Sequence, residues 1–149
     1  MASTLSNATL TVTLSESLTL NGANHGSTKK IQIGGVNEVS KRIMTVATGG
    51  TQIYAGSSAA SYGTFVTSDV KYVRITNLDD TNYIVLHLEG ASHYAQIQIA
   101  AGHAFFLTDL SSTLDNADAI ASYSANDITR IDAMANTAAV DVEIMIASA

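Results

Sequence analysis

The feature that most constrains this chain is an alternation of apolar and polar residues with a period of two. In Leu10–Leu14 and again in Leu18–Leu20, Leu or Val occupies each even position and Thr each odd one. Successive side chains of a β-strand point to opposite faces of a sheet, so this pattern predicts strands with one apolar face. Asn21-Gly22 follows, and both residues adopt positive φ at low cost. The dipeptide therefore predicts a tight turn.

The same alternation closes the chain. Val140, Val142, Ile144 and Ile146 alternate with polar or flexible residues that include Asp141 and Glu143, which predicts a strand with one buried face. Other runs rich in β-branched and aromatic residues predict further strands: Ile31–Ile33, Ser40–Thr48, Gln52–Tyr54, Tyr62–Thr67, Val70–Thr76, Tyr83–Leu88, Tyr94–Ile99, His103–Leu107 and Asp127–Met134.

Two pairs of these runs have turn residues between them. Asn77–Asn82 connects Val70–Thr76 to Tyr83–Leu88, and Ala100-Ala101-Gly102 connects Tyr94–Ile99 to His103–Leu107. Asx residues and Gly favour turns, so we predict a hairpin from each pair.

A helix is indicated only weakly, at Leu110–Ile120, where Ser111 or Ser112 could cap a turn or two. About eight to ten strands and little helix predict an all-β fold, a single-domain antiparallel β-sandwich of jelly-roll-like type. We expect residues 10–149 to form the sandwich and the uncharged residues 1–9 to form an extended N-terminal arm.

Composition favours a surface that other proteins cover, although a low-charge monomer would show the same bias. Charged residues are 13% of the chain, about half the usual share, whereas hydrophobic residues are 46%. A length of 149 residues suffices to bury a core without disulfides, and the chain has no cysteine. The chain begins without a basic and apolar leader and has no apolar run long enough for a membrane span, so we expect neither individual export nor a membrane partner.

The net charge of −6 is divided unevenly. Residues 1–75 carry six basic and three acidic residues, and residues 76–149 carry one basic and ten acidic residues. An acidic chain without a basic run is a poor ligand for phosphates, so no nucleic-acid partner is expected. The asymmetry allows a positive face of one copy to meet a negative face of the next, and it is equally consistent with both halves mixing on one folded surface.

No arrangement of residues predicts catalysis, a cofactor or a metal. The four histidines lack zinc-ligand spacing, and the two Asx-rich segments lack the distant Glu of a calcium loop and match ordinary turn chemistry. The six tyrosines come without the Trp that sugar sites usually stack on, and they are more typical of sheet rims or interfaces. These candidates are His25, His87, His93 and His103; Asp79, Asp80 and Asn82; Asp115, Asn116 and Asp118; and Tyr54, Tyr62, Tyr72, Tyr83, Tyr94 and Tyr123.

Three segments resemble small virion proteins of tailed bacteriophages. They are Val70–Tyr83, which contains Arg-Ile-Thr-Asn-Leu-Asp-Asp-Thr-Asn-Tyr, then Ile97–Leu107, and finally Val140–Ile144. The likeness covers about the second half of the chain and carries no catalytic residue.

The resemblance implies a non-enzymatic structural protein of the virion, assembled in the host cytoplasm. A capsid decoration or cement protein is the first expectation, binding the major capsid protein or other virion proteins and stabilising the phage head as a homo-oligomer, with a trimer favoured. A tail or adaptor component, or a glycan-binding host-adhesion module, is the alternative.

Overall fold

The computed structural model describes residues 6–111, 113–115 and 123–149. Within them the chain forms thirteen strands and one short 3-10 helix, η1 (Thr67–Asp69). Ten strands have four residues or more: β1 (Ala8–Ser15), β4 (Thr28–Val36), β5 (Glu38–Val46), β6 (Thr51–Ser57), β8 (Val70–Asn77), β9 (Ile84–Glu89), β10 (Tyr94–Ile99), β11 (Ala104–Leu107), β12 (Arg130–Ala135) and β13 (Val140–Ser148). Three have two residues each: β2 (Thr19–Leu20), β3 (Ala23–Asn24) and β7 (Phe65–Val66). The predicted all-β class is confirmed.

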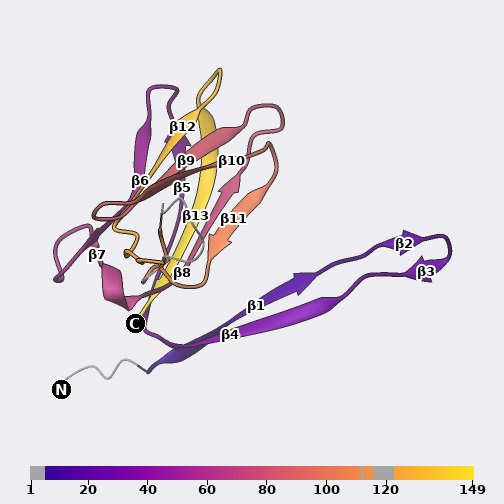
Figure 1. Ribbon diagram of the computed structural model, residues 1–149, viewed down its shortest axis with the longest axis horizontal. Helices are drawn as coiled ribbons and strands as arrows, with labels where there is room; N and C mark the ends of the chain where they lie inside the picture. Colours follow the sequence, from indigo (N-terminus) through magenta and orange to yellow (C-terminus); the bar gives the residue numbers. More distant parts are fainter. Residues whose placement is uncertain (1–5, 112, 116–122) are drawn as a thin grey trace.

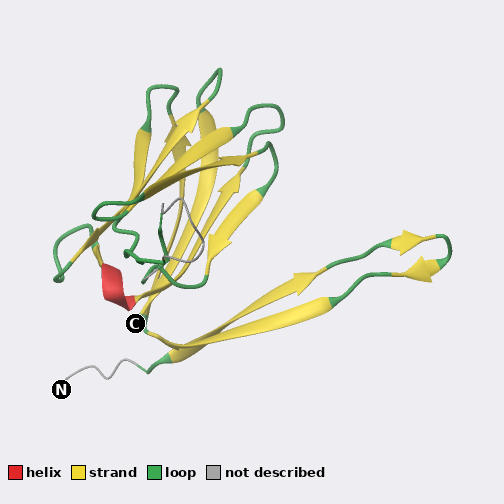
Figure 2. Cartoon of the chain, in the orientation of Figure 1, coloured by secondary structure: helices red, strands yellow, loops and turns green. Residues whose placement is uncertain are grey.

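The body of the molecule is a sandwich of two sheets (Figures 1 and 2). The five-stranded sheet has the order β10-β9-β12-β6-β7, and the four-stranded sheet has the order β11-β8-β13-β5. Strands within each sheet pair antiparallel, except that β6 and β7 are parallel. Buried side chains from both sheets meet in one hydrophobic core between them.

The alternation in the sequence explains which side chains form this core. Every second residue of β13 is buried from Val140 to Ile146, as predicted, and the intervening Asp141, Glu143 and Met145 point away from the core. β9 behaves in the same way, with a buried apolar residue at each even position. Each fully buried aliphatic side chain stabilises the fold by about 1.5–3 kcal/mol.

Neither predicted hairpin forms, because each of the two connections crosses from one sheet to the other. β8 lies in the four-stranded sheet and β9 in the five-stranded sheet, and the next connection leads from β10 back to β11 beside β8. Asn77, at the end of β8, is buried and holds both crossings together. Its amide group donates to the carbonyl oxygens of Asn82 (2.8 Å), Ile99 (3.3 Å) and Ala100 (3.2 Å).

Residues 8–36 are the largest departure from the predicted domain division. We expected residues 10–149 in the sandwich, but β1 and β4 form a separate two-stranded sheet, and β2 and β3 form another at its far end. The whole segment is one long hairpin that projects from the body, as Figure 1 shows. We call it the arm. The expected arm of residues 1–9 therefore overlaps it only at the start of β1.

The weakly indicated helix does not form in the part of Leu110–Ile120 that is described. Leu110 and Leu114 are buried, and Leu114 pairs with Asn126 in an isolated antiparallel bridge. Ser112 and residues 116–120 lie outside the described residues.

Candidate interaction surface

The arm is a single hairpin built from two ladders, β1–β4 and β2–β3, with a register shift between Ala8 and Leu10 at its base. One register runs from Leu10 opposite Ile33, through Leu14 opposite Lys29, to Leu20 opposite Ala23. The predicted turn at its tip is confirmed, since φ is 50° at Asn21 and 79° at Gly22. Positive φ at both central residues matches the right-handed twist of the two strands.

Gly26 lets the two strands of the arm approach closely between the β1–β4 and β2–β3 ladders. A Cβ atom at this position would lie 2.3 Å from the carbonyl oxygen of Glu16, nearer than real atoms approach. Across the same point the Glu16 amide donates to the Ser27 carbonyl oxygen at 2.7 Å, and the Ser27 hydroxyl donates to the Glu16 carboxylate at 2.7 Å.

The arm has one apolar and one polar face, because directly opposed residues of an antiparallel pair share a face. The apolar face consists chiefly of aliphatic residues from both strands: Leu10, Val12, Leu14, Leu18, Leu20, Ala23, Ile31 and Ile33. The opposite face carries Thr11, Thr13, Ser15, Thr19, Asn24, Thr28, Lys30 and Gln32.

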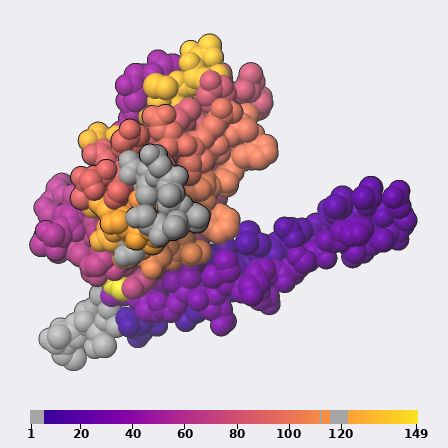
Figure 3. Space-filling model, viewed as in Figure 1, coloured from indigo at the N-terminus to yellow at the C-terminus, as the bar shows by residue number. Residues whose placement is uncertain are grey.

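Only the base of the arm's apolar face is covered by the body. There Leu10, Val12 and Ile33 pack with outward-facing residues of the four-stranded sheet, in a small cluster separate from the main core. The sheet contributes Tyr72, Phe106, Met145 and Ala147 to this cluster. Of residues 8–36, all of which are described, only Val36 is buried. Beyond its base the arm stands clear of the body in the space-filling view (Figure 3).

The outer face of the four-stranded sheet also carries a charge cluster. The Glu143 carboxylate accepts a hydrogen bond from the Arg74 guanidinium and lies 3.1 Å from the Lys41 ammonium. The hydrogen bond from Arg74, followed by that from Lys41, lowers the pKa of Glu143 below its ordinary value. Glu143 is thus a paired residue on this face.

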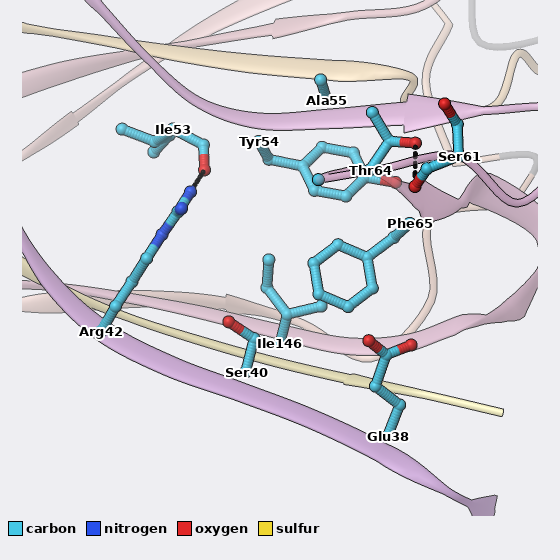
Figure 4. Close-up of a pocket in the computed structure, with 11 residues that line it drawn as sticks. Glu38, Ser40, Arg42, Ile53, Tyr54, Ala55, Ser61, Thr64, Phe65 and Ile146 are labelled. Atoms are coloured by element: carbon cyan, nitrogen blue, oxygen red, sulfur yellow. Dashed lines mark hydrogen bonds between the residues drawn. The ribbon is translucent and has the colours of Figure 1, made fainter.

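A pocket of about 310 Å³ lies at the open side of the sandwich, between β5 and β6–β7. Figure 4 shows Arg42 reaching across it, where the guanidinium donates to the Ile53 carbonyl oxygen at 3.0 Å. Tyr54 stacks on Phe65 on the far wall, with ring centroids 6.4 Å apart. Burial raises the pKa of Tyr54, and the Thr67 hydroxyl partly opposes this shift. The side chain of Arg42 thus bridges the two sheets, from β5 to β6.

The histidines of the sequence are dispersed over the fold. His25 lies in the arm, His87 on the outward face of β9 against Tyr94 (5.9 Å between centroids), and His93 and His103 in turns. The His103 ring Nδ1 lies 2.7 Å from the Ala101 carbonyl oxygen. Among the described residues no group of three or more His, Asp or Glu side chains could hold a metal ion.

In the Asp79–Asn82 segment, the Asp79 carboxylate forms hydrogen bonds within its own turn. The Asp79 carboxylate accepts backbone hydrogen bonds from Asn82 (2.6 Å) and Thr81 (2.8 Å), and these two bonds lower the pKa of Asp79. In the second Asx segment, the Asp115 carboxylate accepts from the Ser124 amide at 2.6 Å. Asn116 and Asp118 lie outside the described residues.

The tyrosines do not gather into one platform. Tyr54 and Tyr72 are buried, and the exposed Tyr62, Tyr94 and Tyr123 come from three different segments. Tyr83 is partly exposed beside β9.

The sequence predicted the strands of the arm but missed that they leave the body. A usable signal was present, because the apolar positions on the two sides of Asn21-Gly22 fall opposite one another about that turn. The charge cluster at Glu143 was also missed, since it joins three strands that are distant in sequence.

No protein-family model, no curated protein and no solved structure matches the chain. In the described part of the chain, no helix has the length and apolar character needed to cross a membrane.

Proposed function

We propose that this chain is a non-enzymatic structural protein of a virion, a capsid decoration or cement protein that binds the phage head as a homo-oligomer. The observation that carries the proposal is the projecting arm, with an apolar face that the body covers only at its base. Monomeric proteins rarely leave such a surface to water, and a large exposed apolar patch marks a site of association.

Two further features support a role in assembly. The chain is poor in charge, and the centres of protein interfaces are depleted of charged residues. The segments that resemble phage virion proteins, Val70–Tyr83 and Ile97–Leu107, contain the two crossings that Asn77 holds together. These segments therefore hold the sandwich together, and the projecting arm is the part that we propose contacts a neighbouring protein.

Immunogold labelling tests the proposal. Antibody raised against the purified protein is applied to particles of the virus that encodes the chain, and label is expected over the head. Antibody pre-absorbed with the protein serves as the control. Label on the tail would move the protein to the tail or adaptor class, and particles that lack the protein by mass spectrometry would end the virion proposal.

A further inference from the structure

The distal half of the arm has an apolar face without a neighbour. The side chains of Leu14, Leu18 and Leu20 are 39%, 54% and 56% exposed. A two-stranded hairpin by itself is marginally stable in water, because it has no second layer on which to bury its apolar side chains. We therefore expect another surface to cover this half in the functional state.

The total exposed area supports the same expectation. A compact monomer of 15.5 kDa exposes about 7,200 Å². This chain exposes 9096 Å², a surplus of about 1,900 Å², and a stable interface buries about 800 Å² on each partner.

A second apolar surface lies on the body of the same chain. Val39 and Ile43 occupy the outward face of the edge strand β5 and are among the exposed large hydrophobic residues. Val39 is directly opposite Ala147, which belongs to the cluster under the base of the arm. The surface that receives the base of the arm thus continues to β5.

The arm and the rest of the chain differ in net charge. Residues 8–36 carry two basic residues and one acidic residue, whereas the rest of the chain carries five basic and twelve acidic residues. On the apolar face of the arm, Lys29 is opposite Leu14, and Glu16 lies between Leu14 and Leu18. On the receiving sheet, the exposed Asp141 is opposite Thr45, two residues from Ile43 on β5. The receiving face carries charges of both signs, because Lys41 lies between Val39 and Ile43 and pairs with Glu143. Lys29 on the arm can therefore meet Asp141 on the body, and Glu16 can meet Lys41.

We propose that the partner of the arm is a second copy of this chain. The distal arm of one copy lies across the outer face of the four-stranded sheet of the next copy, with Leu18 and Leu20 against Val39 and Ile43. This inference rests on the proposed role as a protein present in many copies. Repeated from copy to copy, such a contact closes into a ring or continues as a filament.

Single cysteines test the contact directly, because the chain has none of its own. Leu18→Cys and Ile43→Cys variants are mixed and treated with a short bismaleimide, and a covalent heterodimer is expected. Thr19→Cys, on the polar face of the arm, replaces Leu18→Cys in the control and should give little product. A Leu18→Cys product with itself, formed in place of the heterodimer, would show that arms pack on arms and would overturn the proposal.

Light scattering supplies an independent readout. The exposed pair Leu18→Ser and Leu20→Ser should weaken self-association at least tenfold, while Thr11→Ser and Thr19→Ser should leave it unchanged. A wild-type chain that stays monomeric at high concentration and gives no heterodimer would also overturn the inference. Virion labelling is scored separately, so a labelled particle with a monomeric protein would leave the virion role standing and remove only this contact.

Discussion

At the scale of single residues, the side chain of Asn77 joins the two connections that were predicted to be hairpin turns. Its amide nitrogen donates to carbonyl oxygens on both crossings, and its side-chain oxygen accepts from the Asp79 amide at 3.0 Å. A residue with both a donor and an acceptor on one short side chain can satisfy these groups together. Leu or Ala at this position would remove all of these bonds, and of the three carbonyl oxygens that of Ala100 would still accept from the His103 backbone amide at 3.1 Å.

Asn77→Ala should lower the free energy of unfolding by about 2–4 kcal/mol, because each buried acceptor left unsatisfied costs about 1–3 kcal/mol. Urea unfolding followed by circular dichroism measures the change. Asn136→Ala, at an exposed turn position, is the matched control and should stay within about 0.5 kcal/mol of wild type. Equal losses in both variants would mean that Asn77 does not hold the crossings.

Glu143 provides a pH-dependent prediction. Its pKa is lowered in the folded state, chiefly by the Arg74 hydrogen bond, so the ionised form favours folding. This contribution should be complete above about pH 5 and lost as the pH falls below about 4. Melting temperatures of wild type and Glu143→Gln should therefore differ at pH 7 and approach one another as the pH falls through the lowered pKa of Glu143. In an Arg74→Met background the difference at pH 7 should shrink, and an unchanged difference would assign the effect to another partner.

At the scale of elements, β13 and β5 offer two isoleucines in opposite environments. Ile144 is 1% exposed and Ile43 is 63% exposed, on neighbouring strands of one sheet. Ile144→Ala should reduce stability by about 2–5 kcal/mol through lost burial and the cavity that remains. Ile43→Ala should change the melting temperature little and should weaken association, as measured by light scattering across a dilution series. Small and equal effects on stability would contradict the assignment of β13 as a core strand.

Strand positions were predictable from this sequence because alternation and turn residues act locally. Val140–Ile146 shows this, since its buried and outward positions follow the pattern residue by residue. Which sheet a strand joins is not a local property. The Asn77–Asn82 and Ala100–Gly102 segments contain turn-forming residues whether the chain reverses within a sheet or crosses to the other, and burial of Asn77 decides the outcome only after both sheets are assembled.

The arm illustrates the same limit at the element scale. Its alternation predicts an apolar face, and in a sequence such a face indicates burial without identifying the surface that covers it. Here the body covers the base, through Tyr72 and Phe106, and leaves Leu18 and Leu20 exposed. The candidate interaction surface therefore became visible only once the path of the chain was known.

At the scale of the whole molecule, the arm and the body are joined at one end and differ in how they are stabilised. The sandwich has a core that draws on both of its sheets, whereas the arm has two strands and a small cluster at its base. Asn37 lies between β4 of the arm and β5 of the body, and its backbone amide donates to the Ser148 carbonyl oxygen at 3.0 Å, near the C-terminus. This hydrogen bond fixes the junction between arm and body. This division leaves the arm free to contact a neighbour without disturbing the core.

Small-angle scattering tests this shape. A compact chain of 149 residues has a radius of gyration of about 15 Å, and the projecting arm should raise the value measured for the dilute monomer clearly above that. Replacing residues 13–30 by an Asn-Gly turn between Val12 and Ile31 removes only residues beyond the base of the arm, so the radius should fall toward the compact value while the melting temperature of the body is kept. A full-length monomer already at about 15 Å would mean that the arm folds back on its own body, and Leu18 and Leu20 would then be covered within one chain.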